Sequence, residues 1–112
     1  GIFPQLSYLS SDYKLDYLGS GNYNNEATYR LKVVMPSGKT SIQQYSIKSG
    51  LLLQEEATTA DGKVETTVYN DYRKAGNITL PFEITKNRDE QEVTFKVTEI
   101  KFNDGVSSQD FQ

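Results

Sequence analysis

Residues 51–69 read LLLQEEATTADGKVETTVY, and this stretch predicts a β-hairpin. Asp61-Gly62 is a dipeptide typical of tight two-residue hairpin turns, because both residue types adopt positive φ readily. In the flanking segments 51–60 and 63–73, apolar and β-branched residues alternate with polar ones. This alternation is typical of strands with one buried face. In an amphipathic helix the apolar residues would instead recur about every 3.6 residues, which is one helical turn. We therefore expect two antiparallel strands joined at Asp61-Gly62.

The same alternation extends along the chain in both directions and predicts seven strands in all. The other five are expected at residues 13–19, 26–35, around 42–47, around 78–84 and at 92–103, with turn residues between them. A slip in parity between Ile42 and Tyr45 predicts a β-bulge at Gln43-Gln44. Pro81 lacks an amide donor, so its strand is expected at an edge or bulged. Helix is expected only at residues 3–9 and 107–111, which makes the chain an all-β antiparallel meander.

Composition limits the function classes. The chain has 112 residues, which fits a single domain, and 36% of them are hydrophobic, too many for a disordered tail. With a net charge of −3 and scattered basic residues, nucleic acid is not an expected partner. No apolar run is longer than that of Leu51-Leu52-Leu53, which is far too short for a membrane span. Because the sequence starts at Gly1 without Met, we interpret residues 1–112 as one β domain excised from a larger protein.

The absence of His and Cys excludes two kinds of chemistry. There is no thiolate and no imidazole to bind zinc, and the commonest general base is missing. No Gly-x-Ser-x-Gly elbow is present either. We expect no catalytic residue, no metal and no cofactor in this chain. Two acidic groups, Glu55-Glu56 and Asp89-Glu90 with Glu92, are interpreted as solvated faces rather than a calcium site.

Several short motifs in ordered succession carry a family resemblance. They are Ile2-Phe3-Pro4-Gln5-Leu6, Tyr45-Ser46-Ile47-Lys48-Ser49-Gly50-Leu51-Leu52, Asn70-Asp71-Tyr72-Arg73, Gly76-Asn77-Ile78-Thr79-Leu80-Pro81-Phe82, and Asn103-Asp104 with Asp110-Phe111. The chain resembles the domain appended to insulinase-like (pitrilysin-type) zinc peptidases of Bacteroidetes. That domain is similar to the lipoprotein-sorting carrier (LolA/LolB-like) fold. The resemblance implies a strongly curved antiparallel sheet, an incomplete barrel with an apolar concave face, and a periplasmic or otherwise extracytoplasmic location.

The resemblance also implies a role for that face. A zinc peptidase of this type needs a His-x-x-Glu-His helix, so any peptidase activity would belong to another part of the parent protein. Our leading hypothesis is a noncatalytic accessory domain that contacts the other domains of the parent and binds a hydrophobic ligand or partner segment. Alternatives are a free-standing lipid or lipoprotein carrier, and a structural spacer that fills its own concavity. The candidate binding residues on the apolar parity are Tyr29, Leu31, Val33, Leu53, Val68, Phe82 and Phe95.

Parity also separates residues expected inside the sheet from residues expected outside it. Phe82 and Phe95 are expected in the core, where truncation to Ala costs about 3–5 kcal/mol. Arg30 is on the opposite parity, so its truncation should stay within about 0.5 kcal/mol. Tyr69 is expected to be exposed on the outer face.

Overall fold

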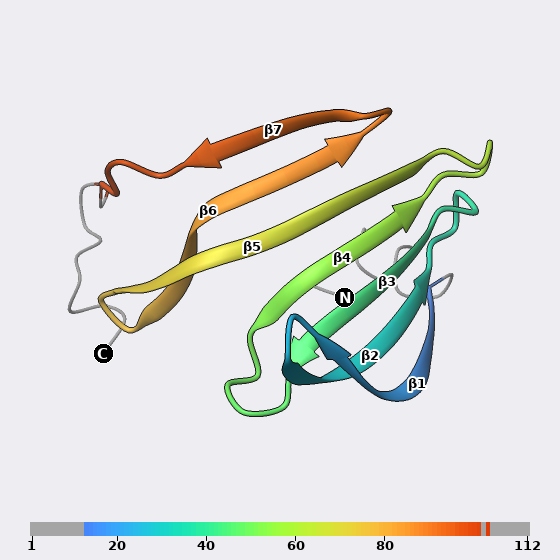
Figure 1. The fold of residues 1–112 in the computed structure, drawn as a ribbon, viewed down its shortest axis with the longest axis horizontal. Helices are drawn as coiled ribbons and strands as arrows, with labels where there is room; N and C mark the ends of the chain where they lie inside the picture. The colour runs from blue at the N-terminus through green and yellow to red at the C-terminus, as the bar shows by residue number, and fades with distance from the viewer. Residues whose placement is uncertain (1–12, 102, 104–112) are drawn as a thin grey trace, which may run out of the picture.

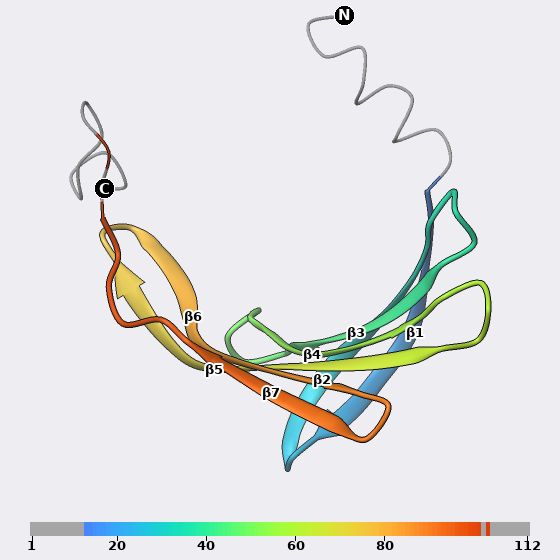
Figure 2. The same ribbon diagram turned by 90° about the horizontal axis from the view of Figure 1, so that it is seen from above.

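The structure, a computed structural model, describes residues 13–101 and 103. These residues form one seven-stranded antiparallel sheet in which each strand pairs with the next along the chain. The strands are β1 (Lys14–Tyr23), β2 (Glu26–Val34), β3 (Thr40–Ser46), β4 (Leu52–Thr58), β5 (Val64–Ala75), β6 (Ile78–Arg88) and β7 (Gln91–Lys96) (Figure 1). The sheet bows into an open trough, and its outer strands β1 and β7 do not meet (Figure 2). The all-β meander and the incomplete barrel are confirmed.

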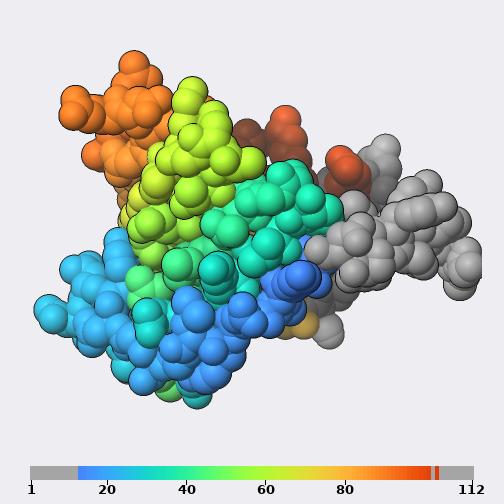
Figure 3. Space-filling model, turned by 90° about the vertical axis from the view of Figure 1, so that its right-hand side faces the viewer, coloured from blue at the N-terminus to red at the C-terminus, as the bar shows by residue number. Residues whose placement is uncertain are grey.

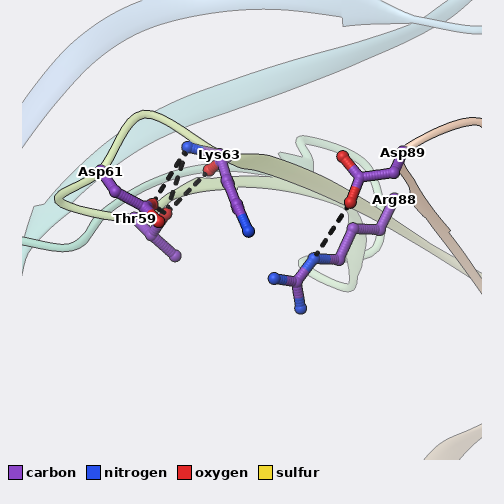
Figure 4. Close-up of polar contacts among 5 residues, drawn as sticks. All are labelled: Thr59, Asp61, Lys63, Arg88 and Asp89. Carbon is purple, nitrogen blue, oxygen red and sulfur yellow. Dashed lines mark hydrogen bonds and ion pairs between the residues drawn. The ribbon is translucent and has the colours of Figure 1, made fainter.

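The hairpin predicted at Asp61-Gly62 forms, but its turn is not the two-residue type, because Asp61 does not have a positive φ and Ala60, Asp61 and Gly62 together make the loop between Thr59 and Lys63. Gly62 has φ of 86°, and the Thr59 amide donates to the Lys63 carbonyl at 2.9 Å. The Thr59 hydroxyl donates to the Asp61 carboxylate, which also accepts from the Lys63 amide (Figure 4). The hairpin between β4 and β5 is therefore fixed by local hydrogen bonds at its tip.

The β1–β2 hairpin differs from the sequence prediction. The predicted loop at residues 20–25 is largely strand, because β1 continues to Tyr23 and only Asn24-Asn25 form the turn, with φ of 52° and 67°. Gly21 fits the strand here for a steric reason. A Cβ atom on Gly21 would lie 2.7 Å from Cδ of Arg30, whose side chain crosses the strand at this point.

The irregularity predicted at Gln43-Gln44 lies on the neighbouring strand instead. The β2–β3 register is unbroken. Between β3 and β4, Gln44 faces Gln54 while Tyr45 faces Leu52, so the extra residue is Leu53 of β4. Ile42 shows no slip in parity. Its side chain simply belongs to the other face, and it is 36% exposed there.

The last two strands also need correction. β6 is an inner strand paired with β5 and β7, so an edge position for Pro81 is wrong. Pro81 faces Tyr72 of β5 and lies outside the β6–β7 ladder, which starts at Glu83. β7 ends at Lys96 rather than at 103, and Ile100 is in no strand. The helices expected at residues 3–9 and 107–111, and Phe102, lie outside the described residues.

Most of the buried residues in this sheet are polar. Among the described residues, Ala57 is the one buried hydrophobic residue, while Thr28, Ser41, Ser46 and Thr67 are buried polar residues. In a space-filling view the strands follow one another across the molecule in chain order (Figure 3). One layer of sheet cannot enclose an apolar core by itself, because each face needs a second layer to cover it.

Candidate functional site

The strand register divides the side chains into two faces. One row across the sheet passes through Leu31, Gln43, Glu55, Thr67, Lys86 and Val93. We call the face that holds this row the Leu31 face. The opposite side, the Thr28 face, holds Thr28 with Ser46 beside it and Lys96 with Glu83 beside it.

Most of the predicted binding residues gather on one face. Tyr29, Leu31, Val33 and Phe95 are all on the Leu31 face, and Leu53 is the extra residue at the β4 irregularity. Phe82 stands two residues before Ile84 in β6, with its ring centre 4.9 Å from the guanidinium carbon of Arg73.

Val68 was wrongly assigned to this set. It faces Gln54 and Thr85, so it belongs to the Thr28 face. In β5, β-branched residues occupy both parities, and the sequence pattern therefore did not distinguish the faces. The neighbour Tyr69 is the residue that reaches the Leu31 face, where it faces Ile84.

The Leu31 face leaves large apolar side chains exposed. Tyr17 is 63% exposed, Tyr29 48% and Phe95 54%. The rings of Tyr17 and Tyr29 contact edge to face, with centroids 6.2 Å apart. The expected loss of about 3–5 kcal/mol for Phe95→Ala applies to a fully buried ring and does not apply here. Exposed apolar side chains in this number mark places where something else can pack.

A polar network interrupts the middle of the Leu31 face. The Tyr45 hydroxyl donates to Oε1 of Gln43 at 2.6 Å, and Nε2 of Gln43 donates to Oε2 of Glu55 at 2.8 Å. Burial, and then the negative charge of Glu55, raises the pKa of Tyr45, and the same two causes lead for the raised pKa of Tyr69. Both phenols stay protonated at neutral pH. The Tyr45 hydroxyl already donates its proton to Gln43, so the phenols serve as neutral hydrogen-bonding groups and are not activated as nucleophiles.

Tyr72 of β5 forms a side-chain hydrogen bond to β4 beside this network. The β4–β5 register stops at Gln54 and Val68, and beyond it the Tyr72 hydroxyl donates to the Leu52 carbonyl at 2.5 Å. Burial raises the pKa of Tyr72, followed by the effect of Tyr69. The ring therefore supplies a cross-strand bond where the backbone ladder ends.

A cavity of about 380 Å³ lies on the Leu31 face at the β6–β7 end of the sheet. This volume is within the range of small-ligand pockets, which starts near 300 Å³. Val93 and Phe95 form its apolar wall. The charged and polar residues that line the rest are Glu65, Lys86, Arg88, Asp89 and Gln91. Because the cavity is lined from the Leu31 face, we assign that face to the concave side of the trough.

The two cations in the cavity are only loosely paired. Nζ of Lys86 lies 3.7 Å from Oε1 of Glu65. Figure 4 shows the other pair, in which Nε of Arg88 lies 4.0 Å from Oδ2 of Asp89. Both pairs are long and substantially exposed to solvent. Such pairs contribute little to stability, so a bound anion could replace either carboxylate at small cost.

Other kinds of site were sought in the same residues. Across the part of the chain that the structure describes, no three or more acidic side chains come together to hold a metal ion. Glu55 and Glu56, for example, point to opposite faces. Within residues 13–101 and 103, no helix has the length and apolar character needed to cross a membrane.

Comparison with solved structures identifies the fold. No known family model matches the sequence, and no curated protein matches it. A domain assigned to outer membrane lipoprotein-sorting proteins, from Vibrio parahaemolyticus, superposes with a TM-score of 0.72 and 14% identity, covering 89% of this chain and 46% of that one. A LolA superfamily protein from Nitrosomonas europaea gives a TM-score of 0.63 and 14% identity, covering 92% of this chain and 52% of that one.

These neighbours define the class of fold. The chain has a LolA-like half-barrel, as the resemblance in its sequence implied. It spans about half the length of the two solved structures that it matches.

Proposed function

We propose that this domain is a noncatalytic half-barrel that binds an acyl-chain ligand with an anionic headgroup on its Leu31 face. One observation carries the proposal. The row Tyr69, Ile84 and Phe95 leads across the face to a cavity that combines the apolar wall of Val93 and Phe95 with the cations Lys86 and Arg88. A hydrocarbon chain would lie along the row, and its headgroup would reach the cations.

The physical chemistry favours an amphiphile over a purely polar ligand. Val93 is 50% exposed and Phe95 54% exposed, so covering them with a hydrocarbon chain removes apolar surface from water. Arg88 can form paired hydrogen bonds to a carboxylate or phosphate, because its guanidinium presents donors in a planar fork.

The domain would act as one part of a larger extracytoplasmic protein. Its structural neighbours, a lipoprotein-sorting protein domain and a LolA superfamily protein, support this setting. The sequence resemblance to a domain of zinc peptidases suggests that the larger protein is a zinc peptidase. This domain would then be an accessory domain, and the peptidase residues would lie elsewhere in that protein. A His-x-x-Glu-His motif in the flanking sequence of the gene product would support that context, and its absence would remove it.

Binding can be measured with a fluorescent long-chain fatty acid. We expect a Kd in the micromolar range and competition by an unlabelled fatty acid. Ile84→Trp, in the middle of the row Tyr69, Ile84 and Phe95, should weaken binding about tenfold or more by occupying the path of the hydrocarbon chain. The matched control is Ile42→Trp, because Ile42 carries a similar side chain on the Thr28 face, where it should leave the Kd unchanged.

The headgroup is tested separately. Arg88→Gln should weaken binding of the fatty acid but not of the fatty alcohol of equal chain length, which carries no charge. Equal loss for both ligands would contradict a role of Arg88 in headgroup binding. If no probe binds up to about millimolar concentration, the ligand hypothesis fails and the structural spacer is the better reading. Delivery of the bound fatty acid to acceptor vesicles would favour the free-standing carrier.

A further inference from the structure

The open edge of β7 has a defined hydrogen-bonding pattern. The Val97 amide donates to the Phe82 carbonyl of β6 at 2.8 Å. In an antiparallel ladder the N–H and C=O of one residue point to the same neighbour, and those of the next residue point the opposite way. The backbone groups of Val93 and Phe95 therefore point to β6. Those of Glu92, Thr94 and Lys96 point away from the sheet.

The two edges of the sheet differ. In β1 the register shifts between Tyr17 and Gly19, and Gly19 has φ of 93°, an irregularity of the kind that protects an edge from further pairing. In β7 the register with β6 runs without a shift from Gln91 to Lys96, and every residue of the strand is exposed. The β7 edge is thus the regular one, ready to accept another strand.

We propose that β7 pairs in antiparallel orientation with β7 of a second copy of this chain, centred on Thr94. In this register each Glu92 lies opposite Lys96 of the second copy, so two opposite-charge pairs form on the Thr28 face. Each Val93 lies opposite Phe95 of the second copy on the Leu31 face. The outward backbone groups of Glu92, Thr94 and Lys96 all find partners.

Neighbouring registers are less favourable. Outward residues must pair with outward residues, so the nearest other centres are Val93 and Phe95. Centring on Val93 places Thr94 opposite Glu92, and centring on Phe95 places it opposite Lys96. Both shifts break the Glu92–Lys96 pairs and the Val93–Phe95 contacts. Cross-strand pairs of these types are the unit of sheet stabilisation, so they select the Thr94 register.

The pairing has a consequence for the concave surface. A twofold axis through Thr94, perpendicular to the sheet, keeps both Leu31 faces on the same side. The dimer would cover part of the exposed rings of Phe95 and join the two apolar surfaces across the interface. A contact along one short strand is smaller than a standard interface of about 1,200–2,000 Å², so the dimer should dissociate on dilution.

Analytical ultracentrifugation of the 112-residue chain tests the proposal. We expect a monomer–dimer equilibrium across roughly micromolar to millimolar concentration. Thr94→Pro removes an outward amide without removing a bond to β6, and it should weaken the dimer about tenfold or more. Thr94→Ala is the control, because it loses the same hydroxyl contact to Thr85 but keeps the amide, and its dimer should persist.

Charge exchange provides a second test. Lys96→Glu places two carboxylates opposite each other at both ends of the interface and should weaken the dimer about tenfold. Adding Glu92→Lys in the same chain restores opposite charges and should recover dimerisation. Thermal unfolding of each variant checks that the monomer is folded. A chain that stays monomeric throughout, a dimer that survives Thr94→Pro, or a double variant without recovery would each overturn the proposal.

Discussion

The two faces of the sheet reverse the usual relation between polarity and burial. On the Thr28 face, Thr28 and Ser46 are 0% exposed, while on the Leu31 face Leu15 is 64% exposed and Tyr17 is 63% exposed. The reversal has a structural cause. Thr28 and Ser46 find hydrogen-bond partners within the sheet, whereas the Leu31 face has large side chains with nothing packed over much of their surface.

Hydrogen bonds on the Thr28 face show how buried hydroxyls are satisfied within the sheet. The Thr28 hydroxyl donates to Oε1 of Gln44 at 2.9 Å, and the Ser46 hydroxyl accepts from the Ser49 amide at 3.1 Å. Buried polar groups are tolerated when they are paired in this way. The Leu31 face gains stability only when a ligand or another protein surface covers it. Burial within the sheet and occupation of the concave face are therefore separate sources of stability.

The first prediction replaces a buried polar residue by an apolar one, and an exposed apolar residue by a polar one. Ser46→Leu should cost about 1–3 kcal/mol, because it overpacks a fully buried site. It also deprives the Ser49 amide of its acceptor. Leu15→Ser should stay within about 0.5 kcal/mol, because this side chain is mostly exposed. Urea unfolding of both variants provides the measurement. A larger loss for Leu15→Ser would mean that the Leu31 face is covered in solution.

The sequence predicted the fold more fully than the site. Asp61-Gly62 identified its hairpin because turn preferences are local, and alternating residues gave the strand count. Face assignment failed at Val68, because β5 carries Thr at both parities and only the register with β4 and β6 shows that Tyr69 faces Ile84. The cavity was not foreseeable, since Lys86 and Arg88 meet Val93 only through cross-strand pairing. No local signal in the sequence reports that contact.

The second prediction concerns Arg30, which the sequence placed among neutral surface residues. Its side chain lies across Gly21 and donates from Nη2 to the Leu18 carbonyl at 3.1 Å. Arg30→Ala should therefore cost about 1 kcal/mol through lost packing and a lost hydrogen bond. Lys14→Ala is the control. Lys14 lies on the Thr28 face, as Arg30 does, but at an exposed position, and its truncation should change stability by no more than about 0.5 kcal/mol. Indistinguishable unfolding midpoints would show that the Arg30 contact is not formed in solution.

The smallest effect is expected at the tip of the β4–β5 hairpin, at a position that belongs to neither face. The Thr59 hydroxyl, and then the Lys63 amide, lower the pKa of Asp61 below its ordinary 3.8. A carboxyl whose pKa is lowered by folding contributes stability above its unfolded pKa, and that contribution disappears as the pH falls through the folded value. Asp61→Asn keeps the acceptor oxygen but cannot titrate, so its unfolding midpoint should fall less than that of the parent chain between about pH 5 and pH 2.

Asp71, whose pKa is lowered by Arg73, is present in both proteins, so its titration cancels in the comparison. Because Asp61 is fully exposed, solvent screening keeps the difference small. An NMR titration that places the pKa of Asp61 at or above 3.8 would show that the hairpin tip does not hold this carboxylate in solution.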